Sequence, residues 1–181
     1  MYATVNILSP AQGDRYTPRD AVVSLAPQTH RLSAAQQLVR DGIGDTLVIS
    51  YFDHDPLNYL PHDPLNLRSG QAADTPPLQN YCETSQEYRT VCFTPEENAT
   101  IGEAYAISQL AKDQAWESLT VVTDPTHAFR TRFIFDQCLA NDLDITVVVS
   151  DRDLEPSDRL WRATYENAAM VKAMWETLWR C

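Results

Sequence analysis

Side chains able to bind an anion or to move a proton follow one apolar run of the chain. His127 and Arg130 stand just after the run 119–124, where a helix is expected to begin. An imidazole titrates near neutrality and suits proton transfer, whereas a guanidinium at a helix start suits a carboxylate or a phosphate. This spacing predicts an anion site in which His127 acts as acid or base.

Similar side chains follow two further apolar runs. We predict that one cleft gathers seven residues: His30, Arg31, Thr100, Glu103, Asp124, His127 and Arg130. In this hypothesis His127, Glu103 and Asp124 are catalytic, with either carboxylate orienting the imidazole. The ligand-binding residues are His30, Arg31, Thr100 and Arg130. The alternative for each residue is a helix-capping role, and for Arg130 it is a structural ion pair with Glu103 or Asp124.

These residues meet only if strands and helices alternate along the chain. Apolar runs predict strands at 21–26, 46–51, 89–93, 119–124 and 144–150, and helical spacing predicts helices at 30–41, 101–116, 129–139 and 157–180. Such alternation predicts a three-layer, Rossmann-like α/β sandwich with a mostly parallel sheet of about five strands. Ligands then bind at the carboxyl ends of the strands, at a switch point between the first and fourth strands.

The domain prediction is one α/β domain over 1–181, with an N-terminal extension at 1–19 and a long loop excursion at 52–88. Within the excursion, His54-Asp-Pro-Leu-Asn58 is repeated as His62-Asp-Pro-Leu-Asn66. The two histidines and nearby aspartates could bind a metal, but the prolines prevent a helix that would hold them on one face. We therefore predict surface turns and no metal site.

The closing helix, 157–180, carries a stripe of large apolar side chains at helical spacing. The stripe consists of Trp161, Tyr165, Ala168, Val171, Trp175 and Leu178. A stripe of this kind usually faces the core. We expect it to pack on the sheet.

Composition excludes several classes of protein. The 181 residues are 44% hydrophobic and 22% charged, which is ordinary globular usage and argues against disorder. With 14 Lys and Arg against 25 Asp and Glu, the net charge of −11 disfavours nucleic acid. No apolar stretch approaches the roughly 20 residues of a membrane-spanning helix. The first residues, 1–18, lack the pattern of a signal peptide.

Four cysteines allow three pairings, and we predict Cys82 with Cys92 and Cys138 with Cys181. Each pair would fasten a loose element, since the first flanks the entry to the third strand and the second joins a helix to the end of the chain. Disulfides persist outside the cytosol, so this pairing predicts an exported chain whose signal or anchor has been removed. The alternative is four buried thiols in a cytoplasmic protein.

Several segments resemble the DUF218 family, also called the YdcF, SanA and ElyC group. The resemblance covers roughly residues 20–149 and rests on Asp20-Ala-Val-Val23, Arg31-Leu-Ser-Ala-Ala35 running into Gly42, Thr100-Ile-Gly-Glu-Ala104, Val121-Val-Thr-Asp124 and His127-Ala-Phe-Arg130. The last two resemble the Val-Thr-Ser strand end and the His-x-x-Arg helix start of the family. The chain is identified as an exported, actinobacterial-type member. It departs from the family at Ser24-Leu-Ala-Pro27 and Ser50-Tyr-Phe-Asp53, where glycine-rich turns are usual.

The resemblance implies a protein of the bacterial envelope, with a membrane tether in the full-length precursor. We expect an enzyme that acts on a small anionic, phosphorylated envelope metabolite. One alternative is a non-catalytic module that binds a ligand or partner in envelope biogenesis. Another is a protein that binds S-adenosylmethionine, as one branch of the family is reported to do. The expected partner is a small anionic ligand and not nucleic acid, while the cofactor and the oligomeric state stay open.

Overall fold

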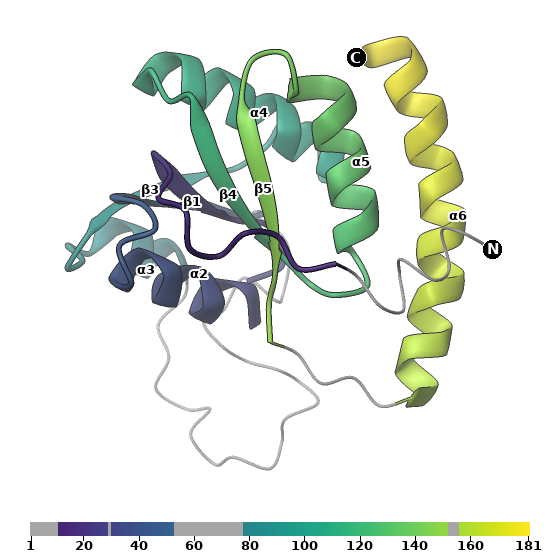
Figure 1. The fold of residues 1–181 in the computed structure, drawn as a ribbon, viewed down its shortest axis with the longest axis horizontal. Coiled ribbons are helices and arrows are strands. Elements are labelled where there is room, and N and C mark those ends of the chain that lie inside the picture. Colours follow the sequence, from purple (N-terminus) through teal and green to yellow (C-terminus); the bar gives the residue numbers. More distant parts are fainter. Residues whose placement is uncertain (1–10, 29, 53–77, 152–155) are drawn as a thin grey trace.

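Five strands form one sheet in the computed structural model, which describes residues 11–28, 30–52, 78–151 and 156–181 (Figure 1). The strands are β1 (Ala21–Ser24), β2 (Thr46–Ser50), β3 (Arg89–Phe93), β4 (Ser118–Thr123) and β5 (Asp144–Val149). Every neighbouring pair runs parallel, in the spatial order β3-β2-β1-β4-β5. The predicted strands and the Rossmann-like α/β arrangement are confirmed.

The strand order reverses beside β1. From β1 the chain passes to β2 and on to β3 at one edge, and it later returns to β4 on the other side of β1. Ser24, at the end of β1, is in register with Ile49 of β2 and Val122 of β4. Such a reversal leaves a crevice at the carboxyl ends of the two strands. The predicted switch point between the first and fourth strands is confirmed.

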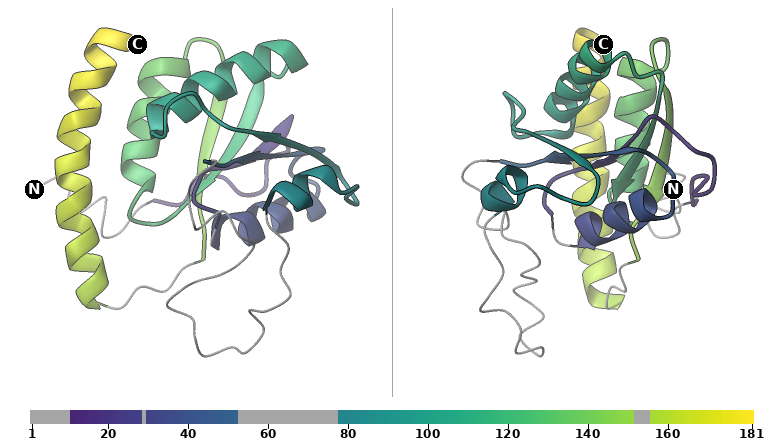
Figure 2. Two further views of the ribbon diagram at one scale, coloured as in Figure 1. Left: turned by 180° about the vertical axis from the view of Figure 1, so that it is seen from behind. Right: turned by 90° about the vertical axis from the view of Figure 1, so that its left-hand side faces the viewer.

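Helices cover both faces of the sheet (Figures 1 and 2). On one face lie α2 (His30–Arg40) and α3 (Leu78–Glu83), and on the other lie α4 (Thr100–Gln114) and α5 (Ala128–Leu139). The last helix, α6 (Pro156–Arg180), packs on the outer side of α5. The sheet is thus the middle of three layers, with α6 added outside one of them.

Alternating side chains of the strands fill the two cores. Val23 and Val121 point to the face covered by α4 and α5, whereas their neighbours Val22 and Val122 point to the face covered by α2 and α3. All four are fully buried. Strands buried on both faces read as continuous apolar runs, which is why their sequence signal is strong.

The predicted packing of the closing helix is wrong. Tyr165, Val171, Trp175 and Leu178 of the predicted stripe are exposed, as is Ala168, while the side chain of Trp161 lies outside the described part. The described residues of α6 that are buried are Glu166, Met170, Ala173 and Thr177. Because α5 separates α6 from the sheet, α6 buries the face that fits α5 and not its most apolar face.

The described end of the predicted loop excursion contains a helix. Leu78 of α3 is buried in the core beneath α2, a feature that the weak periodicity of this segment did not predict. Residues 53–77, including the repeat with His54 and His62, lie outside the described residues. Among the residues that are described, no group of His, Cys, Asp and Glu is placed to hold a metal ion.

Two disulfides join the four cysteines in the predicted pairs. Cys82 of α3 bonds Cys92 of β3, with their Cα atoms 6.0 Å apart, and Cys138 of α5 bonds Cys181, with 4.8 Å between Cα atoms. Disulfides form and persist in oxidising compartments, so both bonds indicate an extracytoplasmic environment. No helix in the described ranges is both long and apolar enough to cross a membrane.

Candidate functional site

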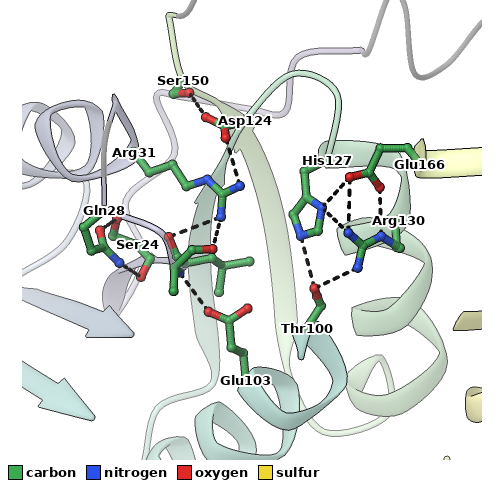
Figure 3. Close-up of polar contacts among 12 residues, drawn as sticks. Ser24, Gln28, Arg31, Thr100, Glu103, Asp124, His127, Arg130, Ser150 and Glu166 are labelled. Carbon is green, nitrogen blue, oxygen red and sulfur yellow. Dashed lines mark hydrogen bonds and ion pairs between the residues drawn. The ribbon is translucent and has the colours of Figure 1, made fainter. Parts of the chain in front are cut away.

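Two groups of polar side chains lie at the carboxyl ends of β1 and β4 (Figure 3). The Arg31 cluster consists of Arg31, Glu103, Asp124 and the turn at Leu25 and Ala26. The His127 cluster consists of Thr100, His127, Arg130 and Glu166. Every polar side chain in the two clusters is buried except that of Arg130, which is 16% exposed.

The guanidinium of Arg31 fastens the turn after β1 to the end of β4. Its Nη2 donates to Asp124 Oδ2 at 2.9 Å, and its Nη1 donates to the carbonyls of Leu25 and Ala26. The other oxygen of Asp124, Oδ1, accepts a hydrogen bond from Ser150 Oγ at 3.3 Å. Arg31 therefore joins α2, β1, β4 and the end of β5 through one buried side chain.

Glu103 completes the Arg31 cluster from the first turn of α4. Its Oε1 accepts the Ala26 N–H at 2.8 Å. Burial raises the pKa of Glu103, although the hydroxyl of Ser50, the Ala26 N–H and the charge of Arg31 favour the ionised form. The position of this turn also depends on Gly102, since a Cβ atom there would lie 2.3 Å from Glu97 O.

Gln28 closes the turn that follows β1. This side chain is fully buried, and its Nε2 donates to Ser50 O at 2.6 Å and to Ser24 O at 3.0 Å. It thus links the ends of β1 and β2 where a glycine would leave open space for a ligand.

His127 is the centre of the second cluster and contacts a different partner through each ring nitrogen. Nε2 lies 3.1 Å from Thr100 Oγ1, and Nδ1 lies 3.3 Å from Glu166 Oε1 and 2.8 Å from Arg130 Nη2. Thr100 is the first residue of α4, after the N-cap Ala99, and its hydroxyl faces the imidazole. The arrangement is a hydroxyl, an imidazole and a carboxylate in series, with a guanidinium beside all three.

The imidazole is neutral at pH 7. Burial lowers the pKa of His127 to about 4, with further lowering by the charges of Arg130 and Arg31, although Glu166 works in the opposite direction. The neighbours serve both neutral tautomers. In the tautomer that the 2.8 Å contact favours, Nδ1 accepts from Arg130 Nη2, which can only donate, and Nε2–H donates to Thr100. In the other, Nδ1–H donates to Glu166 and Nε2 accepts from the Thr100 hydroxyl once Nη2 has moved away from Nδ1. A ring with partners for both tautomers can pass a proton between its two sides.

Arg130 lies in the first turn of α5, where the helix dipole disfavours a cation. Glu166 offsets this from α6, because its Oε2 accepts from Arg130 Nε at 2.8 Å and its Oε1 accepts from Nη2 at 3.2 Å. Burial alone would raise the pKa of Glu166, but hydrogen bonds from His127 and Arg130 outweigh burial and lower it to about 2. Nη1 of Arg130 contacts Thr100 Oγ1 at 3.3 Å, so the guanidinium reaches the hydroxyl as well.

The structure divides the predicted site residues between the two clusters. Arg31, Glu103 and Asp124 fall in the first, and Thr100, His127 and Arg130 fall in the second. His30 is the first residue of α2 and is partly exposed. The carboxylate on His127 is Glu166, whereas Glu103 and Asp124 bind the β1 turn and Arg31. The predicted structural partner of Arg130 likewise differs, since Glu166 takes that place.

Periodicity does not reveal Glu166, because the strongest apolar pattern of α6 lies on another face of the helix. A weaker signal was present, since Glu166, Met170, Ala173 and Thr177 follow helical spacing along a second face. A carboxylate within that face could have suggested a buried cationic partner, because buried charges are paired.

Comparison with protein-family models, curated proteins and solved structures finds no match to this chain. Resemblance to the DUF218 family therefore stays a prediction that rests on the motifs quoted above. The site itself has the groups needed for proton transfer to or from an oxygen. They are the buried hydroxyl of Thr100, the neutral imidazole of His127 with hydrogen-bond partners at both nitrogens, and the carboxylate of Glu166. The guanidinium and the uncapped first turn of α4 favour negative charge beside them.

Proposed function

We propose that this protein is an extracytoplasmic enzyme that acts on a small anionic metabolite of the cell envelope, one that carries a phosphoryl group. The observation that supports this most is the His127 cluster, in which His127 contacts Thr100 on one side and Glu166 on the other. Its position at the switch point is where open α/β sheets bind ligands.

Each residue of the cluster has a role in this proposal. His127 transfers the proton, and Glu166 is the positioning residue that holds both the imidazole and the guanidinium of Arg130 in place. Nη1 of Arg130 and the N–H groups that begin α4 bind anionic oxygens of the substrate. Thr100 passes the proton between substrate and imidazole, because its Oγ1 reaches both His127 and Arg130.

The disulfides support the proposed compartment and argue against S-adenosylmethionine as the ligand. That compound is made in the cytosol, whereas the two bonds indicate an oxidising environment. Export of the chain, by a secretory signal or a membrane anchor of the precursor, is part of the proposal. An envelope metabolite is a substrate that meets the protein there.

A thermal-shift panel of sugar phosphates, prenyl phosphates, nucleotides and S-adenosylmethionine tests the proposal. A ligand at 100 times its dissociation constant stabilises the protein by about 2.7 kcal/mol, a shift that is easily detected. Any phosphorylated hit is then incubated with the protein, and products are followed by mass spectrometry. Arg40→Gln is the control, since Arg40 is an exposed arginine at the C-terminal end of α2, opposite the end that carries Arg31.

The result expected is a phosphorylated ligand that is converted by wild type and by Arg40→Gln but not by His127→Gln. A ligand that binds and is recovered unchanged would instead make the protein a binding module. A panel in which only S-adenosylmethionine stabilises the chain would overturn the anionic-metabolite proposal.

A further inference from the structure

The outer face of α6 concentrates exposed apolar side chains. Of the large apolar residues that the structure describes as exposed, six belong to this helix: Tyr165, Val171, Met174, Trp175, Leu178 and Trp179. We call these six residues the α6 stripe. Monomeric proteins rarely expose such a contiguous patch, and patches of this kind mark interaction surfaces.

The α6 stripe is not needed to hold α6 on the protein. The opposite face of the helix already packs on α5 through Met170, Ala173 and Thr177, and Glu166 bonds Arg130 from that face. The disulfide between Cys138 and Cys181 also ties the end of α6 to α5. Figure 1 shows α6 as the outermost helix on this side of the sheet. The stripe is therefore a surface that the described residues of the chain leave uncovered.

The exposed area of the α6 stripe matches what a dimer of this chain needs. Trp175, Trp179 and Tyr165 are 65%, 74% and 61% exposed, which together equals two whole aromatic side chains, or roughly 300–500 Å². Two copies would bury twice that area, and the three aliphatic members would add more. A specific interface requires about 1,000 Å² in total, with Trp and Tyr as its usual energetic centres.

Two members of the α6 stripe already form an aromatic pair, because Trp175 and Trp179 lie in ring contact at 6.0 Å between centroids. A homodimer sets the same patch of both copies against each other around a two-fold axis, so this pair would enter the interface from both sides.

A membrane surface fits the α6 stripe less well than a second copy does. A helix that lies in a membrane interface is typically rich in Lys and Arg on its polar face. In α6 the exposed Lys172 pairs with Glu176 and Arg180 pairs with Glu97, and the chain has a net charge of −11, so no free cationic face stands beside the stripe in the described residues. We propose that the α6 stripe is a homodimer interface, in which two copies of α6 pack against each other around a two-fold axis.

Analytical ultracentrifugation of the full chain over a range of concentrations tests this interface. We expect reversible association of the 20.5 kDa chain to a species of twice that mass. Replacement of one central tryptophan weakens an interface about thirtyfold. Because a two-fold interface contains Trp175 from both copies, Trp175→Glu should raise the dimer dissociation constant about a thousandfold. Because Trp175 is exposed in the monomer, its replacement leaves the fold intact.

Tyr16→Glu is the matched control, since Tyr16 is 85% exposed and lies outside α6. This variant should dimerise like wild type. A wild-type chain that stays monomeric at every attainable concentration, or a Trp175→Glu chain that still dimerises, overturns the proposal. Flotation of monomeric wild type with phosphatidylcholine vesicles, abolished by Trp175→Glu, would also overturn it and would assign the stripe to a membrane.

Discussion

The Arg31 and His127 clusters each contain an arginine and a carboxylate, and they differ in the other groups that the arginine contacts. Each has an arginine paired with a buried carboxylate, at 2.9 Å between Arg31 and Asp124 and at 2.8 Å between Arg130 and Glu166. The other terminal nitrogen of Arg31, Nη1, donates to main-chain carbonyls, and the Arg31 side chain is 5% exposed. Arg130 instead contacts a hydroxyl and an imidazole, and its side chain is partly open to solvent.

This difference distinguishes an arginine that holds the fold together from one whose contacts a ligand can replace. Main-chain carbonyls cannot be exchanged for a ligand without opening the turn after β1. A hydroxyl and an imidazole can exchange partners, because each both donates and accepts hydrogen bonds. The comparison predicts that Arg31 stabilises the fold and that Arg130 acts on a ligand, although sequence reasoning gave both the same role.

The largest effect is expected for Arg31→Met. The variant leaves the carboxylate of Asp124 buried without its partner, and breaking a buried ion pair in this way costs about 3–5 kcal/mol. Urea denaturation measures the loss in the free energy of unfolding. The double variant Arg31→Met with Asp124→Asn should recover part of it, because the unpaired charge is gone. A loss below about 1 kcal/mol, the range of a surface ion pair, would show that Arg31 does not hold the fold together.

A pH effect of His127 comes next. The pKa of His127 is about 4 in the folded chain and about 6.5 when unfolded, so the unfolded state binds more protons between these values. The free energy of unfolding should therefore fall as pH falls from about 6.5 to 4, by up to about 3 kcal/mol. His127→Gln removes this contribution. Parallel stability-against-pH curves for the two proteins would contradict the buried neutral imidazole.

Arg130→Gln should have a smaller effect on stability and a specific effect on binding. The partial exposure of Arg130 limits the cost of leaving Glu166 unpaired to about 1–3 kcal/mol. Affinity for a phosphorylated ligand should fall tenfold or more, which corresponds to about 1.4 kcal/mol. Denaturation and ligand titration on the same preparation separate the two quantities. Unchanged affinity with a large stability loss would place Arg130 in the same class as Arg31.

Glu166→Gln sharpens the comparison with the smallest change in structure. The amide keeps the shape of the side chain but removes the negative charge beside His127 and Arg130. We expect the pKa of His127 to fall further, because the Glu166 carboxylate raises it, and turnover to fall while ligand affinity holds. Nitrogen NMR of the imidazole follows the pKa, and an unchanged pKa with unchanged turnover would remove Glu166 from the mechanism.

Local sequence patterns predict the fold and the edge of the sheet at which the site residues lie, but not which of these residues contact one another. Val22 and Val23 occupy a run that is apolar at every position, and such a run predicts a strand buried on both faces. The cysteine pairs followed from where each cysteine stood relative to the predicted elements. Helix α3 was not predictable, because six residues carry too little periodicity.

The sequence by itself determined the strands, their parallel order and the edge of the sheet at which the polar side chains gather, because these depend on short-range periodicity and on general rules of chain connection. Only the tertiary structure decided the partners. Helical spacing shows that α6 has an apolar face and a mixed face but not which one is buried. That choice depended on α5, where Arg130 and His127 bind the carboxylate of Glu166 and turn the tryptophans outward. Contacts between residues far apart in sequence leave no periodic signal, so they appear only when the chain is folded.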